Sequence, residues 1–162
     1  MEILSVKNLN FTYAQAFERT LSCLDFSVSE GEFITLAGDT GSGKTTLLKL
    51  LKRELSPKGE RTGRIRLFGK DQAALSEREA AEKIGYVMQI PEQQLVTDKV
   101  YHELSFGLES LGCPQDIIRR RVTEMACYFG IESWFERPVN ELSGGQKQLL
   151  NLASVMVMQP RI

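Results

Sequence analysis

The stretch "GDTGSGKT", residues 38–45, decides the fold of this chain. A glycine, four residues and then Gly43-Lys44-Thr45 is the spacing at which a glycine-rich loop can curl round an anion. The apolar run "FITLA" precedes the loop, and "TLLKLLKREL", with leucines at helical spacing, follows it as far as Pro57. The pattern predicts a buried strand, a glycine loop and a helix, in that order.

The residue types of the loop suit phosphate groups. Glycines let backbone N–H groups surround phosphate oxygens, a lysine adds positive charge, and a threonine hydroxyl can hold Mg²⁺. The alternative is a flexible turn with a solvated lysine. The expected nucleotide-binding residues are Gly38, Asp39, Thr40, Gly41, Ser42, Gly43, Lys44, Thr45 and Thr46. We expect the carboxylate of Asp39 to point outward, because it would repel an anion.

The rest of the first half reads mainly as sheet. Residues 2–13 are mostly alternating, a turn is expected at 29–32, and "GRIRLFG", 63–69, predicts an antiparallel strand with one wet face. "IGYVM", 84–88, reads as a second buried strand. An α/β fold is therefore expected, with a mixed sheet of parallel and antiparallel parts.

The period becomes helical from Val100 to Met158. One helix is expected to end at Gly112, and a second to run from Pro114, at its first helical position, to Gly130. A last helix begins near Ser143. The change near residue 95 indicates a subdomain boundary.

Composition excludes several classes of function. The 162 residues carry a formal net charge of -1, so nothing favours nucleic acid. Cys23, Cys113 and Cys127 lack close metal-ligand spacing, which favours reduced thiols in a cytosol. No apolar run reaches the roughly 20 residues that span a bilayer, so any membrane role is expected to be peripheral.

A second glycine motif, "LSGGQ", occupies residues 142–146. Ser143 and Gln146 have the spacing of a capping box at a helix start. A helix N-terminus with free N–H groups and a serine hydroxyl is also an anion site. The structural and the binding interpretations describe the same geometry.

The two motifs, about 100 residues apart, resemble the ATP-binding subunit of ABC transporters, where LSGGQ is the signature sequence. The resemblance implies an incomplete ABC ATPase fold, a single partial domain with a P-loop NTPase core, an N-terminal antiparallel β part and a helical signature subdomain. Its expected parts are the nucleotide-binding core at 1–94, the helical signature subdomain at 95–150, and a helix at 151–162 that leads to a further strand.

The resemblance also implies roles for single residues. Tyr13 matches the aromatic that stacks on adenine; the alternative is an edge aromatic that alternates with Phe11. Gln89 matches the glutamine that reaches Mg²⁺ and the attacking water; the alternative is an ordinary polar residue at a strand end. Lys44 and Gln89 are thus the expected catalytic residues, and Thr45 and Gln89 the expected Mg²⁺ ligands.

A longer stretch, "QIPEQQLVTDKVYHELSFGLESLG" from Gln89 to Gly112, is similar to the energy-coupling factor and cobalt or nickel importer branch. Ile90 and Gln93 depart from that branch, and His102 is not the family's switch histidine but is expected to be a surface or packing residue. The matching residues are Thr40, Gln89, Pro91, Glu92, Gln94, Glu103, Phe106 and Gly107.

In the family, two subunits pair head to tail around two ATP molecules and drive transmembrane subunits. The resemblance implies that Ser143, Gly144, Gly145 and Gln146 complete the site of a partner molecule. It also implies a cytoplasmic subunit, peripheral on the inner face of the membrane, that energises uptake of a vitamin or metal ion. The alternatives are a soluble ABC ATPase without a membrane partner and a non-catalytic nucleotide-binding fragment.

The family places an Asp for Mg²⁺ and a water-activating Glu on the strand that follows a "QP" like Gln159-Pro160, and a switch histidine beyond it. Those residues do not occur within the 162. A general base contributes about 10²- to 10⁴-fold to a rate. We therefore expect this chain to bind ATP weakly or not at all and not to turn it over.

Overall fold

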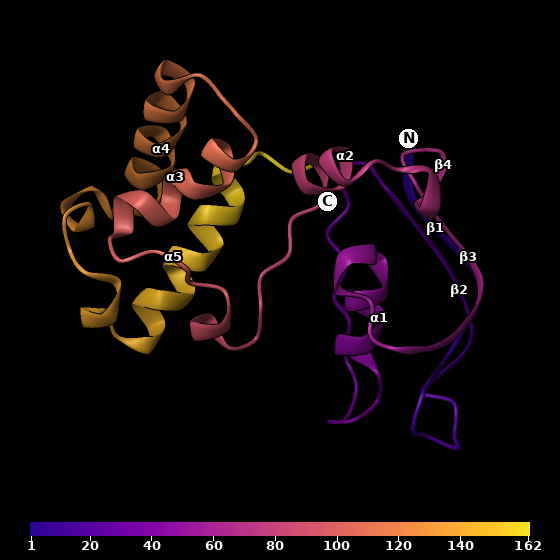
Figure 1. Cartoon of the computed structure of the whole chain (residues 1–162). Coiled ribbons are helices and arrows are strands. Elements are labelled where there is room, and N and C mark those ends of the chain that lie inside the picture. Colours follow the sequence, from indigo (N-terminus) through magenta and orange to yellow (C-terminus); the bar gives the residue numbers. More distant parts are fainter. The chain divides into compact units, whose positions relative to one another are not determined.

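The structure, a computed structural model, describes residues 1–162. It consists of two compact units, unit 1 from Met1 to Glu77 and unit 2 from Arg78 to Ile162. Unit 1 contains the sheet and the helix α1, and unit 2 contains the helices α3, α4 and α5 (Figure 1). The expected division of a single domain after residue 94 stays a prediction.

Unit 1 is built on a four-stranded sheet in the order β2-β1-β3-β4. The strands are β1 (Glu2–Tyr13), β2 (Leu21–Ser29), β3 (Gly59–Leu67) and β4 (Lys70–Asp71), and every neighbouring pair is antiparallel. The register of β1 shifts beside Asn8, which has a φ of 46°. Asparagine tolerates this left-handed conformation better than most residues, so it suits a bulge. The predicted strand at 2–13 is confirmed.

The helix after the glycine loop is shorter than expected. α1 spans Lys44–Leu51, and a separate 3₁₀ turn, η1, spans Arg53–Leu55. Gln72, in η2 (Gln72–Ala74), explains the stop, because its Nε2 donates to the carbonyl oxygens of Leu50 at 2.7 Å and Leu51 at 3.0 Å. These are carbonyls that a helix end leaves without an intrahelical partner.

Two predicted strands are not formed, and the mixed sheet is therefore wrong for this structure. Residues 33–37 belong to no strand, and Phe33 is 92% exposed. Residues 84–88 also belong to no strand, although Ile84 is buried. A parallel strand needs backbone partners on a neighbouring strand, and none of the four strands of the sheet pairs with either segment.

A short parallel pairing is nevertheless present within unit 2. The N–H of Ile162 donates to the carbonyl of Lys83 at 3.1 Å, and the N–H of Gly85 donates to the carbonyl of Ile162 at 2.7 Å. In a parallel ladder, a residue donates to the residue before its partner and accepts from the residue after its partner. Ile162 does this with Lys83 and Gly85. The segment at 84–88 thus has a backbone partner at its first residues.

Unit 2 is helical, as predicted. Its helices are α3 (Val100–Ser110), α4 (Gln115–Phe129) and α5 (Gly144–Val157), and α2 (Glu77–Lys83) begins at the junction of the units. Three short turns, η3 (Pro91–Gln93), η4 (Glu132–Trp134) and η5 (Val139–Glu141), connect them. α4 ends at Gly130, whose φ of 66° suits glycine. Pro114 is the N-cap of α4, so the helix begins one residue later than predicted.

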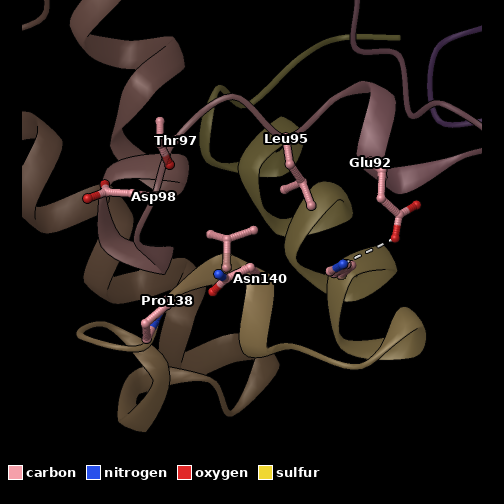
Figure 2. Close-up of a pocket in the computed structure, with 8 residues that line it drawn as sticks. Glu92, Leu95, Thr97, Asp98, Pro138 and Asn140 are labelled. Carbon is pink, nitrogen blue, oxygen red and sulfur yellow. Dashed lines mark hydrogen bonds and ion pairs between the residues drawn. The ribbon is translucent and has the colours of Figure 1, made fainter.

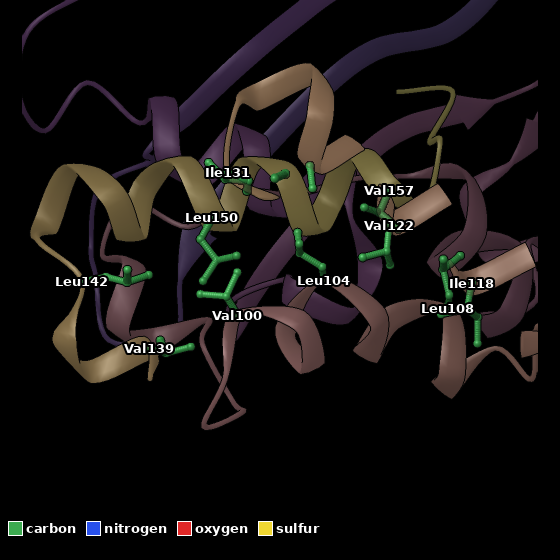
Figure 3. Packing of buried hydrophobic residues seen from close by; sticks show 12 residues of the cluster. Val100, Leu104, Leu108, Ile118, Val122, Ile131, Val139, Leu142, Leu150 and Val157 are labelled. Atoms are coloured by element: carbon green, nitrogen blue, oxygen red, sulfur yellow. The ribbon is translucent and has the colours of Figure 1, made fainter. Parts of the chain in front are cut away.

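The core of unit 2 lies between α3, α4 and α5 (Figure 3). α5 contributes side chains three and four positions apart, the spacing that lines one helix face. No helix of the chain has the length and apolar character needed to cross a bilayer. The buried cluster contains Val100, Leu104, Leu108, Ile118, Val122, Ala126, Ile131, Val139, Leu142, Leu150, Ala153 and Val157.

Candidate functional site

The glycine loop leaves the start of α1 open. Gly43 precedes the helix with a φ of 92°, and no side chain caps the N–H groups of the first turn. A Cβ on Gly43 would lie 2.8 Å from Leu21 Cδ2, so only glycine fits the backbone there. Free N–H groups at a helix start attract phosphate oxygens. The loop therefore has the geometry of a phosphate cradle.

Lys44 folds back over this loop. Its Nζ donates to the carbonyl oxygens of Gly38 at 2.7 Å and Asp39 at 2.6 Å, and to Ser42 Oγ at 3.3 Å. These contacts hold the ammonium group above the loop, where it can attract a phosphate that enters. Asp39, Thr40, Gly41 and Ser42 are all exposed.

Tyr13 is bonded to the start of α1. Its Oη lies 2.8 Å from Thr46 Oγ1, and its ring meets the edge of Phe11 at 5.0 Å between centroids. The residue is 37% exposed, so part of the ring stays open to a ligand. Packing against Phe11 and stacking on adenine are compatible, and the second stays a prediction.

Thr45 suits a magnesium ion. It is exposed at the first turn of α1, next to Lys44, and its hydroxyl oxygen is a ligand type that Mg²⁺ accepts together with phosphate oxygens and waters. The second expected ligand, Gln89, belongs to unit 2 and is also exposed. Its amide oxygen is again of a suitable type, so the donor chemistry of both residues fits.

The segment that carries Gln89 is closed by one side chain. Gln94 Oε1 accepts from the N–H of Met88 at 2.8 Å, and Gln94 Nε2 donates to the carbonyl of Tyr86 at 3.4 Å. We call residues 86–94 the glutamine turn. The amide of Gln94 is thus the hydrogen-bond partner of both Met88 and Tyr86, and it joins the end of the turn to its beginning.

A buried carboxylate fixes the chain beyond the turn. Glu103 is 4% exposed, and its Oε2 accepts from the N–H of Val96 at 3.1 Å, the N–H of Thr97 at 2.9 Å and Thr97 Oγ1 at 2.8 Å. A buried carboxylate is tolerated when several donors surround it. Glu103 therefore anchors the residues that follow the turn to α3.

The second glycine motif forms the predicted capping box. Gln146 N–H donates to Ser143 Oγ at 3.3 Å, and Ser143 N–H donates to Gln146 Oε1 at 2.9 Å. Gly144 and Gly145 are exposed, and nothing lies within 4 Å of a Cβ built on either. The front of α5 is thus a capped, open surface on which another molecule can approach the backbone closely.

Two residues of α5 that sequence reasoning missed contact the glutamine turn. Lys147 Nζ lies 3.2 Å from Glu92 Oε1, and Asn151 Nδ2 donates to the carbonyl of Pro91 at 3.2 Å. The backbone N–H of Glu92 and the neighbouring Lys147 hold the pKa of the Glu92 carboxyl below its usual value. One signal was present in the sequence, since Asn151 interrupts an apolar helix face.

A pocket of about 350 Å³ lies between the glutamine turn, the residues that precede α3, η5 and the first turn of α5 (Figure 2). His102, on α3, is exposed, and its Nδ1 lies 3.1 Å from Asp98 Oδ1. That hydrogen bond lowers the pKa of the Asp98 carboxyl. The pocket is lined by Glu92, Leu95, Thr97, Asp98, Pro138, Val139, Asn140 and Lys147.

Known proteins resemble the chain along almost its whole length. The family described as "ABC transporter" matches residues 21–162. An ABC transporter ATP-binding protein of Bacillus anthracis is 48% identical over 157 residues, which cover 97% of this chain and 28% of that protein. The energy-coupling factor transporter ATP-binding protein EcfA1 of Oenococcus oeni is 36% identical over 162 residues, 100% of this chain and 57% of that protein.

A solved structure shows the same fold. It is CbiO1 of Clostridium perfringens, described as part of the ABC transporter complex cbiONQ, with a TM-score of 0.83 and 33% identity over 98% of this chain and 62% of that one. The chain therefore spans between roughly a quarter and two thirds of the length of these relatives.

Proposed function

From the premise that this chain belongs to the ABC transporter family of ATP-binding proteins, we propose that it holds Mg²⁺ and ATP on the loop at 38–46. It does so as the nucleotide-binding part of a transport ATPase that energises uptake of a small nutrient. The observation that carries the proposal is the open start of α1 beneath the ammonium group of Lys44. This arrangement presents backbone N–H groups and a positive charge to the same small volume.

The residues of the proposed nucleotide site have separate roles. The loop N–H groups and Lys44 bind the phosphates, Thr45 holds Mg²⁺ with its hydroxyl oxygen, and the Tyr13 ring stacks on the adenine. Mg²⁺, when bound, neutralises charge on the phosphate oxygens. Gln89 orients the water that attacks the outermost phosphate.

A second subunit completes the site. We propose that Ser143, Gly144, Gly145 and Gln146 bind the ATP held by a partner ATPase, either identical or a paralogue, in a head-to-tail pair. The support is the exposed, capped front of α5, where the glycines leave the backbone accessible.

Transmembrane subunits are the second class of partner. We propose that they contact unit 2 at the pocket beside the glutamine turn, so the chain works in the cytoplasm at the inner face of the membrane. The uptake direction, and a vitamin or metal ion as cargo, are proposed from the resemblance of residues 89–112 to the importer branch. The names of the relatives EcfA1 and CbiO1 support a transporter.

Turnover needs a water-activating carboxylate. The 162 residues offer Lys44 and Gln89 but not the family's Asp and Glu on the strand that follows a "QP" like Gln159-Pro160. We therefore propose that this chain, by itself, holds ATP weakly and does not hydrolyse it.

The test is titration of the chain with a fluorescent ATP analogue and Mg²⁺, alongside Lys44→Ala. We expect weak binding that Lys44→Ala reduces at least about tenfold, because a charged hydrogen-bond donor is lost. Equal binding by both proteins would contradict the phosphate-site assignment. Steady-state ATP hydrolysis that Lys44→Ala abolishes would contradict the predicted lack of turnover.

A further inference from the structure

A buried amide on α5 is unusual for its surroundings. Asn151 is 0% exposed, between the core residues Leu150 and Ala153. Its Nδ2 donates to the carbonyl of Pro91, but its Oδ1 has no hydrogen-bond partner. A buried polar atom without a partner destabilises a folded protein, and most such atoms are paired. An apolar side chain would suit the stability of this helix better, so packing alone does not account for an asparagine at this position.

A second contact to the same turn lies one helical turn earlier on α5. Lys147 and Asn151 are four residues apart, so they lie on the same helix face. Their partners Glu92 and Pro91 are adjacent in η3. The side chain of Lys147 is only 18% exposed, so the lysine is held close to the surface of unit 2. Two contacts from one face to adjacent residues fix the orientation of η3 as well as its position.

The contacts to η3 extend to Gln89. The carbonyl oxygen of Pro91, which accepts a hydrogen bond from Asn151, also accepts from the N–H groups of Gln94 at 3.0 Å and Leu95 at 3.2 Å. The same oxygen therefore holds the backbone of η3 in its turn. Gln94 in turn binds the backbone of Met88, the residue before Gln89. Any movement of η3 therefore moves the backbone on both sides of Gln89.

We propose that Lys147 and Asn151 are positioning residues that hold the glutamine turn to the signature helix α5, so that the two move as one body. Asn151 provides the buried attachment and Lys147 the one nearer the surface. When a partner's ATP binds at Gly144 and Gly145, α5 transmits its displacement to Gln89. The roles of Gln89 and the glycines rest on the proposed function, whereas the attachment is a property of unit 2 alone.

The first experiment replaces Asn151 by leucine, which has a similar volume and removes both the donor and the unpaired oxygen. We expect the urea midpoint to stay or rise, while amide hydrogen exchange over residues 89–95 becomes at least about fivefold faster. Ser154→Ala is the matched control, because Ser154 Oγ bonds only within α5, to the Asn151 carbonyl at 3.0 Å. It should leave exchange at 89–95 unchanged.

The second experiment keeps the proposal testable if Asn151→Leu does not fold. Lys147→Met and Glu92→Gln should each speed exchange at 89–95 about two- to fivefold, the range expected for a partly exposed ion pair. The double variant should do no more than either single one, because both remove the same contact. Arg120→Met is the control, since it removes the Arg120–Glu124 pair on α4, at 3.9 Å.

Three results would overturn the proposal: unchanged exchange at 89–95 in both Asn151→Leu and Lys147→Met, additive effects of Lys147→Met and Glu92→Gln, or an equal effect of Arg120→Met. All measurements are made without nucleotide. If the chain failed to bind ATP, the proposed function would be refuted, but the exchange results would stand. If the exchange rates at 89–95 did not respond to the substitutions, the attachment would be refuted, but the ATP-binding result would stand.

Discussion

The hydroxyl oxygens of Tyr13 and Thr46 lie 2.8 Å apart. This contact joins the last residue of β1 to the first turn of α1, so the sheet and the phosphate loop are connected by one side-chain pair. Thr46 is buried, whereas Tyr13 keeps part of its ring exposed. The hydroxyl of Tyr13 therefore has a structural task, and its ring is left for ligand contact.

Tyr13→Phe separates these two tasks. We expect the free energy of unfolding of unit 1 to fall by about 1 kcal/mol in urea denaturation, because the Thr46 hydroxyl loses its partner. Binding of an adenine nucleotide should change little, whereas Tyr13→Ala should weaken it about tenfold through the lost stacking. Equal affinities of Tyr13→Phe and Tyr13→Ala would contradict the stacking role.

Gly43→Ala should destabilise unit 1 more than Gly31→Ala. Both glycines have positive φ, 92° and 82°, which costs any other residue about 1 kcal/mol or more. Only at Gly43 would the new Cβ also meet other atoms, Leu21 Cδ2 at 2.8 Å and the carbonyl of Thr20 at 3.1 Å. Urea denaturation of the two variants measures the difference, and equal losses would show that the loop relaxes freely.

Gly145→Ala should raise stability and lower function. Nothing lies within 4 Å of the new Cβ, and alanine in a helix is favoured over glycine by roughly 0.5–1 kcal/mol. The same methyl group would obstruct a partner's ATP. We expect a higher thermal midpoint for unit 2 and loss of any ATP-dependent dimer in analytical ultracentrifugation. An ATP-dependent dimer that survives in this variant would argue against the role in trans.

Low pH should reduce the folding stability of unit 2, because carboxylates that are paired in the folded state become protonated. Hydrogen bonds from the Glu92 backbone and from Lys147 lower the pKa of Glu92, and the hydrogen bond and charge of Lys99 lower the pKa of Glu136, both from 4.5. Because the folded-state pKa values lie below the unfolded ones, this stabilisation is complete above about pH 4.5 and is lost as the pH falls through the folded-state values.

Urea midpoints between pH 7 and pH 3 would measure this loss. Glu136→Gln removes one of the two carboxylates, so the urea midpoint of this variant should fall less steeply as the pH is lowered. Its loss of stability at pH 7 should be small, because the side chain of Glu136 is 85% exposed. If the urea midpoint fell equally with pH in Glu136→Gln and in the parent chain, the pH dependence would come from other groups.

Local patterns predicted much of the fold and of the site. The alternation at 2–13 gave β1, the helical period after Val100 gave α3, α4 and α5, and Ser143 with Gln146 gave the capping box. The alternation predicted β1 although its partners on β2 and β3 lie farther along the chain. The helices and the cap depend on contacts between residues near one another in the chain, so spacing alone predicts them. The family followed from two short motifs for the same reason, and the comparisons confirm it.

The predicted strands at 33–37 and 84–88 failed because a parallel strand depends on distant partners. The sequence shows that a segment is apolar, but the backbone hydrogen bonds come from elsewhere in the chain. Only the tertiary structure revealed that residues 83–85 pair with Ile162 and that the side chain of Gln94 serves as a partner for Met88.

The sequence by itself determined the loop at 38–45, the cap of α5 at Ser143, the end of α4 before Gly130, and the family, because each depends on residue type and short spacing. Only the tertiary structure decided that Lys147 and Asn151 contact Glu92 and Pro91, which lie 55 and 60 positions away. A surface lysine and a helical asparagine are common in any sequence. Their meaning comes from the packing of α5 against η3, which brings together residues that no local pattern connects.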